Sequence, residues 1–171
     1  MNERGNYAFI DGQNLHLWTT NDSPPWKVDI YKFRTYLRDK YKVSKAFYFL
    51  WYVQDKNRDM YFDLQSAGFI VVFKEQLWSM KTSKKGNVDS DIIFHIMRCL
   101  IDERDGFERV ILVSGDGDYK NVVDYLIKKD KLHKILFPNR KFASSLYRKL
   151  ETSFFDYLTN IKHKIIYEKS K

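Results

Sequence analysis

Residues 110–118 read VILVSGDGD, and this stretch gives the strongest indication of the fold. The first four residues are apolar, and a short run rich in Val and Ile is typical of a buried strand. Two glycines then allow the backbone to bend tightly, and they place two carboxylates directly after the strand. In an open parallel sheet this position is the carboxyl edge, where ligands usually bind.

The beginning of the chain repeats this pattern. Residues 7–10, YAFI, form an apolar run that ends on Asp11, Gly12, Gln13 and Asn14. The run predicts a first strand, and the polar residues after it predict a turn. Asp11 is therefore expected at the same edge of the sheet as Asp116 and Asp118.

Strand-like and helix-like segments alternate along the rest of the chain. Strands are expected at Tyr7–Ile10, Lys45–Val53, Phe69–Phe73, Arg109–Val113 and Lys134–Phe137. Helices are expected at about Ile30–Tyr41, Asp55–Ala67, Val88–Asp102, Asp118–Lys129 and Phe142–Leu150. This order predicts an α/β, Rossmann-like fold with a mostly parallel central sheet of about five strands and helices on both faces. A chain of 171 residues favours a single domain over residues 1–171, with a basic tail from about residue 160 that frays at its end.

A further acid comes from the helix expected to begin near Val88. The apolar residues Ile93, Ile96 and Leu100 recur at helical spacing, and Asp89 lies on the same stripe. Asp91 lies instead on a polar face and is interpreted as a solvated acid of the first turn. Alternatively, Asp89 caps the helix or pairs with a buried basic group.

Asp11, Asp89, Asp116 and Asp118 are thus the candidate catalytic and metal-binding residues. Carboxylates that converge repel one another and stay ionised together only around a cation. Hard oxygen ligands of this kind suit Mg²⁺ or Mn²⁺. Such an ion on a phosphodiester activates water and stabilises charge on the phosphate, which is nuclease chemistry.

The formal net charge of +8 favours a polyanionic partner, and nucleic acid is the first candidate. The alternative is that many soluble proteins are basic without binding a polyanion. The candidate RNA-binding residues are Lys81, Lys84, Lys85, Arg140 and Lys141 for phosphates, with Trp78 to stack on an unpaired base. The lysines at 128–131 follow a helix and are interpreted as solvated cations at its end.

Cys99 is the single cysteine, so neither an intrachain disulfide nor a thiolate zinc site is expected. No cleavable leader is expected, and no run of eighteen apolar residues predicts a membrane span. These features favour a cytoplasmic protein.

Three blocks of the chain resemble the signature blocks of NYN domains, a branch of the PIN-like nucleases. They are FIDGQN at 9–14, KGNVD at 85–89 and VSGDGDY at 113–119. The resemblance implies a PIN fold, dependence on Mg²⁺ or Mn²⁺, and endonuclease cleavage of RNA that leaves 5′-phosphate and 3′-hydroxyl ends. It transfers metal-binding and catalytic roles to Asp11, Asp89, Asp116 and Asp118, with Asn14 and Ser114 as supporting polar groups.

Two details of the resemblance leave choices open. Some NYN domains carry another acid six residues after the position of Asp89, where this chain has His95, so the number of metal ions stays open. PIN-like domains often pair, which implies a homodimer. A module that binds RNA or a protein without cutting is the alternative function. A phosphohydrolase of small substrates is disfavoured, because Gln13 stands where an aspartyl-phosphate route needs a second acid.

Overall fold

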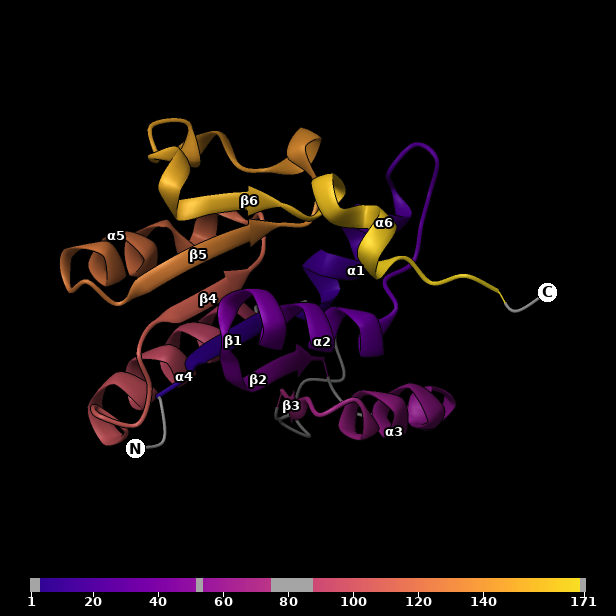
Figure 1. The fold of residues 1–171 in the computed structure, drawn as a ribbon, viewed down its shortest axis with the longest axis horizontal. Coiled ribbons are helices and arrows are strands. Elements are labelled where there is room, and N and C mark those ends of the chain that lie inside the picture. The colour runs from indigo at the N-terminus through magenta and orange to yellow at the C-terminus, as the bar shows by residue number, and fades with distance from the viewer. Residues whose placement is uncertain (1–3, 52–53, 75–87, 170–171) are drawn as a thin grey trace, which may run out of the picture.

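The computed structural model describes residues 4–51, 54–74 and 88–169. Within them a six-stranded sheet has the order β3-β2-β1-β4-β5-β6, and neighbouring strands are parallel throughout (Figure 1). The strands are β1 (Asn6–Asp11), β2 (Val43–Leu50), β3 (Ile70–Phe73), β4 (Val110–Val113), β5 (Leu132–Phe137) and β6 (Phe155–Tyr157). The predicted α/β fold with a parallel sheet is confirmed.

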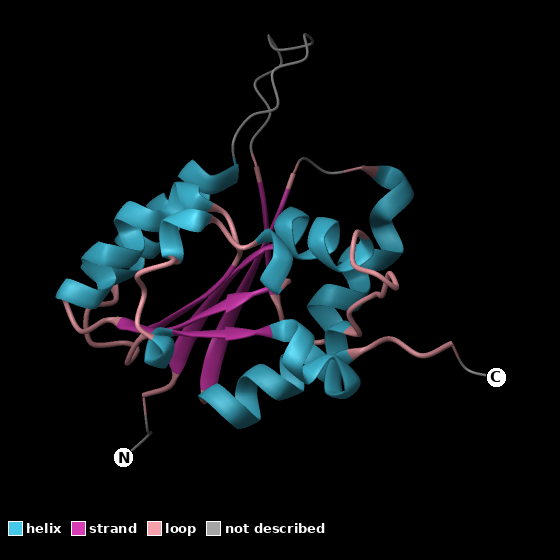
Figure 2. Cartoon of the chain, turned by 90° about the horizontal axis from the view of Figure 1, so that it is seen from above, coloured by secondary structure: helices cyan, strands magenta, loops and turns pink. Residues whose placement is uncertain are grey.

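Helices cover both faces of this sheet (Figure 2). They are α1 (Gly12–Thr20), α2 (Ile30–Tyr41), α3 (Arg58–Ser66), α4 (Val88–Asp102), α5 (Lys120–Lys128) and α6 (Lys162–Ile165). No helix in the described ranges has the length and apolar character needed to cross a membrane.

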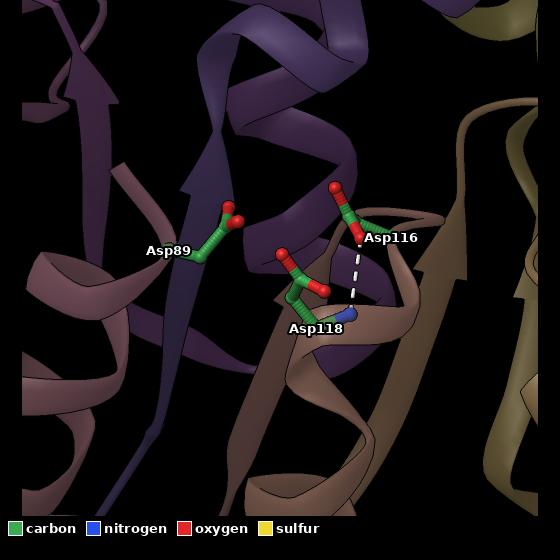
Figure 3. Close-up of side chains that lie close together, drawn as sticks. All are labelled: Asp89, Asp116 and Asp118. Atoms are coloured by element: carbon green, nitrogen blue, oxygen red, sulfur yellow. Dashed lines mark hydrogen bonds between the residues drawn. The ribbon is translucent and has the colours of Figure 1, made fainter. Parts of the chain in front are cut away.

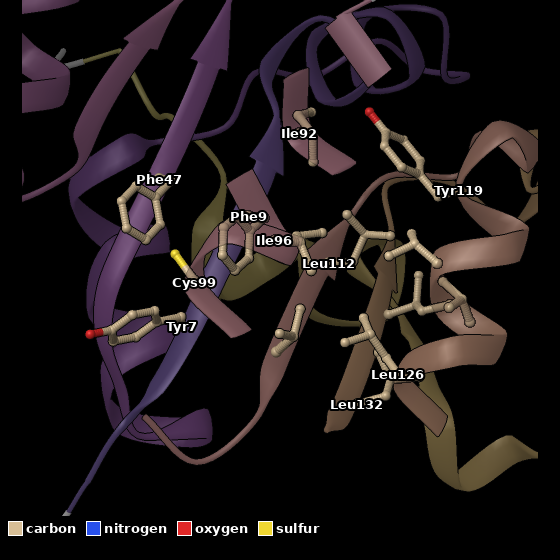
Figure 4. Close-up of a cluster of buried hydrophobic side chains, with 14 of the residues drawn as sticks. Tyr7, Phe9, Phe47, Ile92, Ile96, Cys99, Leu112, Tyr119, Leu126 and Leu132 are labelled. Atoms are coloured by element: carbon tan, nitrogen blue, oxygen red, sulfur yellow. The ribbon is translucent and has the colours of Figure 1, made fainter. Parts of the chain in front are cut away.

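The alternating side chains of the central strands divide the core into two clusters. In β1, Tyr7 and Phe9 point to the face covered by α4, where they meet Ile92 and Ile96 (Figure 4). Ala8 and Ile10 belong to the cluster on the other face, together with buried residues of α1, α2 and α3. Successive residues of a strand face opposite sides, so a strand that is apolar at every position is buried on both. Each fully buried large side chain contributes about 1.5–3 kcal/mol.

The strand order reverses between β1 and β4. From β1 the chain proceeds outward through β2 to β3, then crosses back through α4 to β4 and continues outward to β6. Such a reversal separates the connections at the carboxyl edge and leaves room for a ligand. Asp11 ends β1 and Ser114 follows β4, so the two acidic stretches flank this point.

Helix α1, strand β6 and the short helix α6 (Lys162–Ile165), which lies in the expected basic tail, were not predicted from the sequence. Helix α1 has weak helix formers at Gly12 and Thr19, and only the cap at Asp11 marks its beginning. Strand β6 has three residues, which is too short for an alternating pattern to be recognised, and it brings the sheet to six strands instead of about five.

The predicted helix at Phe142–Leu150 is wrong. The chain there forms two 3₁₀ turns, Arg140–Phe142 and Ser145–Tyr147. Asn139 accepts a hydrogen bond from the backbone N–H of Lys141, and Ser144 accepts one from that of Leu146. Side chains that pair with the nearby backbone in this way favour turns over a continuous helix.

The helices predicted at Ile30–Tyr41 and Val88–Asp102 form with these bounds, and the remaining predicted elements form with shifted ends. The strand expected at Lys45–Val53 spans Val43–Leu50, and the strand expected at Lys134–Phe137 begins at Leu132. The helices expected from Asp55 and Asp118 begin with a 3₁₀ turn and become α-helical at Arg58 and Lys120. Differences of this size are usual where caps and tight turns decide the end of an element.

Candidate metal centre at the carboxyl edge of the sheet

Asp11 is the last residue of β1, and only 5 % of it is exposed. Its Oδ1 accepts a hydrogen bond of 3.0 Å from the backbone N–H of Asn14, which caps α1. Its Oδ2 lies 3.0 Å from the hydroxyl of Tyr119. Burial raises the pKa of Asp11, although these two hydrogen bonds act in the opposite direction.

Asp89 is the second residue of α4 and is 7 % exposed. The buried stripe of this helix consists of Ile92, Ile96 and Cys99. The expected stripe was Ile93, Ile96 and Leu100, so two of its three residues are replaced by the residue before them. Asp89 lies on this stripe, as expected, whereas Asp91 is partly exposed. The Oδ1 of Asp89 lies 2.8 Å from the hydroxyl of Tyr119.

The carboxyl group of Asp89 is held in an unfavourable environment for a charge. Its pKa is raised to about 6, first by burial and then by the negative charges of Asp11 and Asp116. A bound cation would reverse this effect by favouring the ionised form. The group is therefore suited to a site where a cation is present.

Asp116 and Asp118 lie in the loop after β4. The Oδ1 of Asp116 accepts a hydrogen bond of 3.0 Å from the backbone N–H of Asp118 (Figure 3). The hydroxyl of Tyr147 donates to the backbone carbonyl of Asp116 at 2.7 Å. A Cβ on Gly117 would lie 2.6 Å from Oγ of Ser144, so the loop needs a glycine at this position.

The two supporting residues hold the same loop. The side-chain oxygen of Asn14 accepts a hydrogen bond of 2.9 Å from the backbone N–H of Gly115. The Oγ of Ser114 accepts one of 3.2 Å from the backbone N–H of Asp116. Asn14 thus connects the beginning of α1 to the loop after β4, across the point where the strand order reverses.

Three of the four predicted carboxylates converge. Asp89, Asp116 and Asp118 each place one carboxylate oxygen so that all three oxygens lie within 4.8 Å of one another (Figure 3). Oxygens at these separations could share a single divalent ion, whose oxygen ligands lie about 2.0–2.6 Å away. Asp11 stands beside this group, with its oxygens directed to Asn14 and Tyr119. A donor set made only of carboxylates fits a hard cation.

His95 does not belong to this group. Its ring packs against Phe49, with centroids 5.2 Å apart, and against Phe47. Burial and the neighbouring Arg98 lower the pKa of the imidazole, which favours its neutral form. Among the residues that the structure describes, the cluster is formed by aspartates alone.

The structure describes two of the six candidate RNA-binding residues. Arg140 and Lys141 lie just beyond the end of β5, at the carboxyl edge. The guanidinium carbon of Arg140 is 4.5 Å from the ring centroid of Tyr157, and the backbone N–H of Lys141 donates to Asn139. Lys81, Lys84, Lys85 and Trp78 lie outside the described residues.

Sequence reasoning assigned no role to Tyr119 or Tyr147. The side chain of Tyr119 is fully buried. Its hydroxyl contacts both Asp11 and Asp89, two acids that are 78 residues apart in the chain. The sequence feature that could have indicated this role is the position of Tyr119, which directly follows Asp116 and Asp118 at the beginning of a helix. Tyr147 is 31 residues from Asp116, and nothing in the sequence indicated that contact.

The NYN domain family matches this chain over residues 7–158, from β1 to the residue after β6. The chain belongs to the NYN domain family. NYN domains are part of the PIN-like nuclease superfamily, and this chain carries an aspartate cluster that could hold a metal ion.

Comparison with solved structures supports the same fold. The chain is similar to a crystal structure of a protein of unknown function from Vibrio parahaemolyticus, with 23 % sequence identity and a TM-score of 0.73. The similarity covers 98 % of this chain and 99 % of that one. No curated protein matches the sequence.

Proposed function

We propose that this NYN domain is a metal-dependent endoribonuclease. It hydrolyses phosphodiester bonds in RNA with Mg²⁺ or Mn²⁺ and leaves 5′-phosphate and 3′-hydroxyl ends. The observation that supports this most is the convergence of Asp89, Asp116 and Asp118 within 4.8 Å, at the point of the sheet where the strand order reverses.

Each acid has a separate part in this proposal. Asp89, Asp116 and Asp118 hold the ion through one carboxylate oxygen each. Asp11 adds negative charge beside them and is fixed by its contacts with Asn14 and Tyr119. A divalent ion in such a site lowers the pKa of water and stabilises the charge that develops on the phosphate. Tyr119 and Asn14 orient the carboxylates, so little reorganisation is needed when RNA binds.

The RNA contacts rest on charge and position. The net charge of +8 attracts a polyanion, and Arg140 and Lys141 lie at the same edge as the acids. Lys81, Lys84, Lys85 and Trp78 precede Asp89 by a few residues, and we assign phosphate contacts to the lysines and base stacking to the tryptophan. The single free Cys99, buried against the sheet, is consistent with a reducing cytoplasmic location. A homodimer is proposed from the family resemblance.

The test is cleavage of an end-labelled single-stranded RNA with Mg²⁺ or Mn²⁺. The unmodified protein should cut internally, and both Asp116→Asn and excess chelator should abolish cutting. Mass spectrometry of the products should show 5′-phosphate and 3′-hydroxyl ends. Cutting that persists in chelator would contradict the proposal. Metal-dependent binding without cutting would favour a module that only binds RNA.

A further inference from the structure

A cavity of about 560 Å³ lies beside the aspartates, between α1, α3 and the end of β2. This volume is within the range of sites that bind small organic molecules, about 300–1,000 Å³. The cavity begins at Gly12, the residue that follows Asp11, and consecutive Cα atoms are about 3.8 Å apart. One wall of the cavity therefore adjoins Asp11, which stands beside the aspartate cluster.

The walls of the cavity combine apolar surface with unpaired polar groups. Leu15, Leu50 and Leu64 supply apolar surface, and the exposed side chains of Gln13 and His16 lie at its border. Within the part of the chain that the structure describes, neither side chain forms a hydrogen bond. Flat molecules with apolar faces and a polar edge match such walls.

Tyr48 supplies the most specific feature of the cavity. It is 8 % exposed and lines the cavity, yet the described residues offer its hydroxyl no hydrogen-bond partner. Among the described residues, the indole N–H of Trp51, which also lines the cavity, is the buried side-chain polar group without a hydrogen-bond partner. A buried polar group normally has a partner, so this N–H at the cavity wall indicates a ligand that accepts from it. The ring of Tyr48 packs against Gly12, where a Cβ would lie 2.4 Å from Cε1 of Tyr48. The negative charge of Asp11 acts on the same phenol.

The charge of the cavity lining is positive. Among the described residues that line the cavity, Lys27 is the one charged residue and none is an acid. A cationic ligand is therefore not favoured, whereas a neutral ring attached to a phosphate is.

We propose that this cavity binds the base of a nucleotide that adjoins the cleaved phosphate, and that it thereby selects where the RNA is cut. This inference rests on the proposed ribonuclease function. The base lies against the leucine side chains, its polar edge bonds to the hydroxyl of Tyr48 and to Gln13 or His16, and Lys27 faces its phosphate. Base-edge hydrogen bonds carry the selectivity, because each type of base presents a different pattern of donors and acceptors.

The first test measures binding without cleavage. The metal-free protein is titrated with AMP, GMP, CMP or UMP, and backbone amide shifts are followed by NMR. We expect one base to bind tightest and to shift the amides of Gly12, Gln13 and Asn57. Tyr48→Phe should weaken that binding about five- to tenfold, the value of one lost hydrogen bond. Tyr125→Phe, a tyrosine of α5 outside the cavity, should leave it unchanged. Equal shifts for all four nucleotides, or shifts confined to other residues, would overturn the proposal.

The second test reads the cleavage positions in a pool of random-sequence RNAs. Met60→Trp places a larger side chain at the wall of the cavity on α3, and it should reduce the base preference at one position next to the cut at least fivefold. Phe62→Trp, on the same helix but outside the cavity, is the matched control. If Met60→Trp still cuts RNA with an unchanged base preference, the proposed base site is contradicted and the proposed ribonuclease function is not. If the unmodified protein cuts nothing, the proposed function fails, and the NMR titration still decides whether the cavity binds a base.

Discussion

The hydroxyl of Tyr119 lies within hydrogen-bonding distance of both Asp11 and Asp89. Burial and these two acids raise its pKa far above the ordinary value, so the phenol keeps its proton. A phenol has one proton to donate, so the second contact needs a proton on one of the carboxyl groups. Burial raises the pKa of both carboxyl groups, that of Asp89 to about 6, so below this pH Asp89 carries such a proton when no cation is bound.

Tyr119→Phe should therefore weaken metal binding without removing any ligand. The loss of a group that orients ligands typically reduces metal affinity or activity about ten- to a hundredfold. We expect a higher metal concentration to be needed for half-maximal cleavage, with activity restored in excess Mn²⁺. The measurement is the cleavage rate as a function of Mn²⁺ concentration. Asp116→Asn, assayed in parallel, should not be restored at any concentration.

The pH dependence of stability follows from the same carboxyl group. The pKa of Asp89 is higher in the folded protein, about 6, than the ordinary 3.8, so the folded state binds this proton more tightly than the unfolded state does. Its contribution to stability is present below pH 4 and is lost as the pH rises through about 6. In chelator, the melting temperature should fall more between pH 4 and 7 for the unmodified protein than for Asp89→Asn. Equal falls would contradict this assignment, and added Mg²⁺ should restore stability at pH 7.

The four candidate aspartates and their place at the carboxyl edge of the sheet could be predicted from the sequence, because each acid follows a strand or begins a helix. The contacts of Tyr119 and Tyr147 could not, since they depend on how α5 and the turn at Ser145–Tyr147 pack against the loop. Such contacts join residues distant in the chain, and one sequence has no pattern that indicates them.

Helix α1 begins on the side chain of Asp11, so one residue both caps a helix and faces the metal centre. Asparagine caps a helix about as well as aspartate, whereas alanine costs about 0.5–2 kcal/mol. Asp11→Asn should thus keep the stability of the protein and lose cleavage, and Asp11→Ala should lose both. Urea unfolding in chelator checks the first part and the RNA assay the second. A destabilised Asp11→Asn would show that the charge, more than the cap, holds α1.

Strands and long helices were predicted better than short elements. Residues 7–10 of β1 and all four residues of β4 are apolar and buried, and α4 has a clear stripe, so their patterns extend over enough residues to be recognised. Strand β6, by contrast, pairs with β5 through only three residues. The turns at residues 140–147 depend on the side chains of Asn139 and Ser144 and not on any periodicity.

For the whole molecule, the net charge of +8 predicts salt-dependent RNA binding. Each lost phosphate contact to single-stranded RNA should reduce the slope of log K against log salt concentration by about 0.7. Arg140→Ala and Lys141→Ala should each reduce it by this amount, because both residues lie at the carboxyl edge. Lys128→Ala, at the end of α5, should leave the slope unchanged. Binding by fluorescence anisotropy between 50 and 200 mM salt, in chelator, measures this; equal slopes for all three variants would place the RNA elsewhere.

The acids of the metal centre come from the end of β1, the beginning of α4 and the loop after β4. A ribosome completes these segments one after another. A growing chain that has reached only α4 contains Asp11 and Asp89 but not Asp116 or Asp118. The hydrogen bond from Tyr147 to the backbone carbonyl of Asp116 forms only after residue 147 has been added. An unfinished copy of the protein therefore lacks the complete aspartate cluster until the residues after β4 have been synthesised.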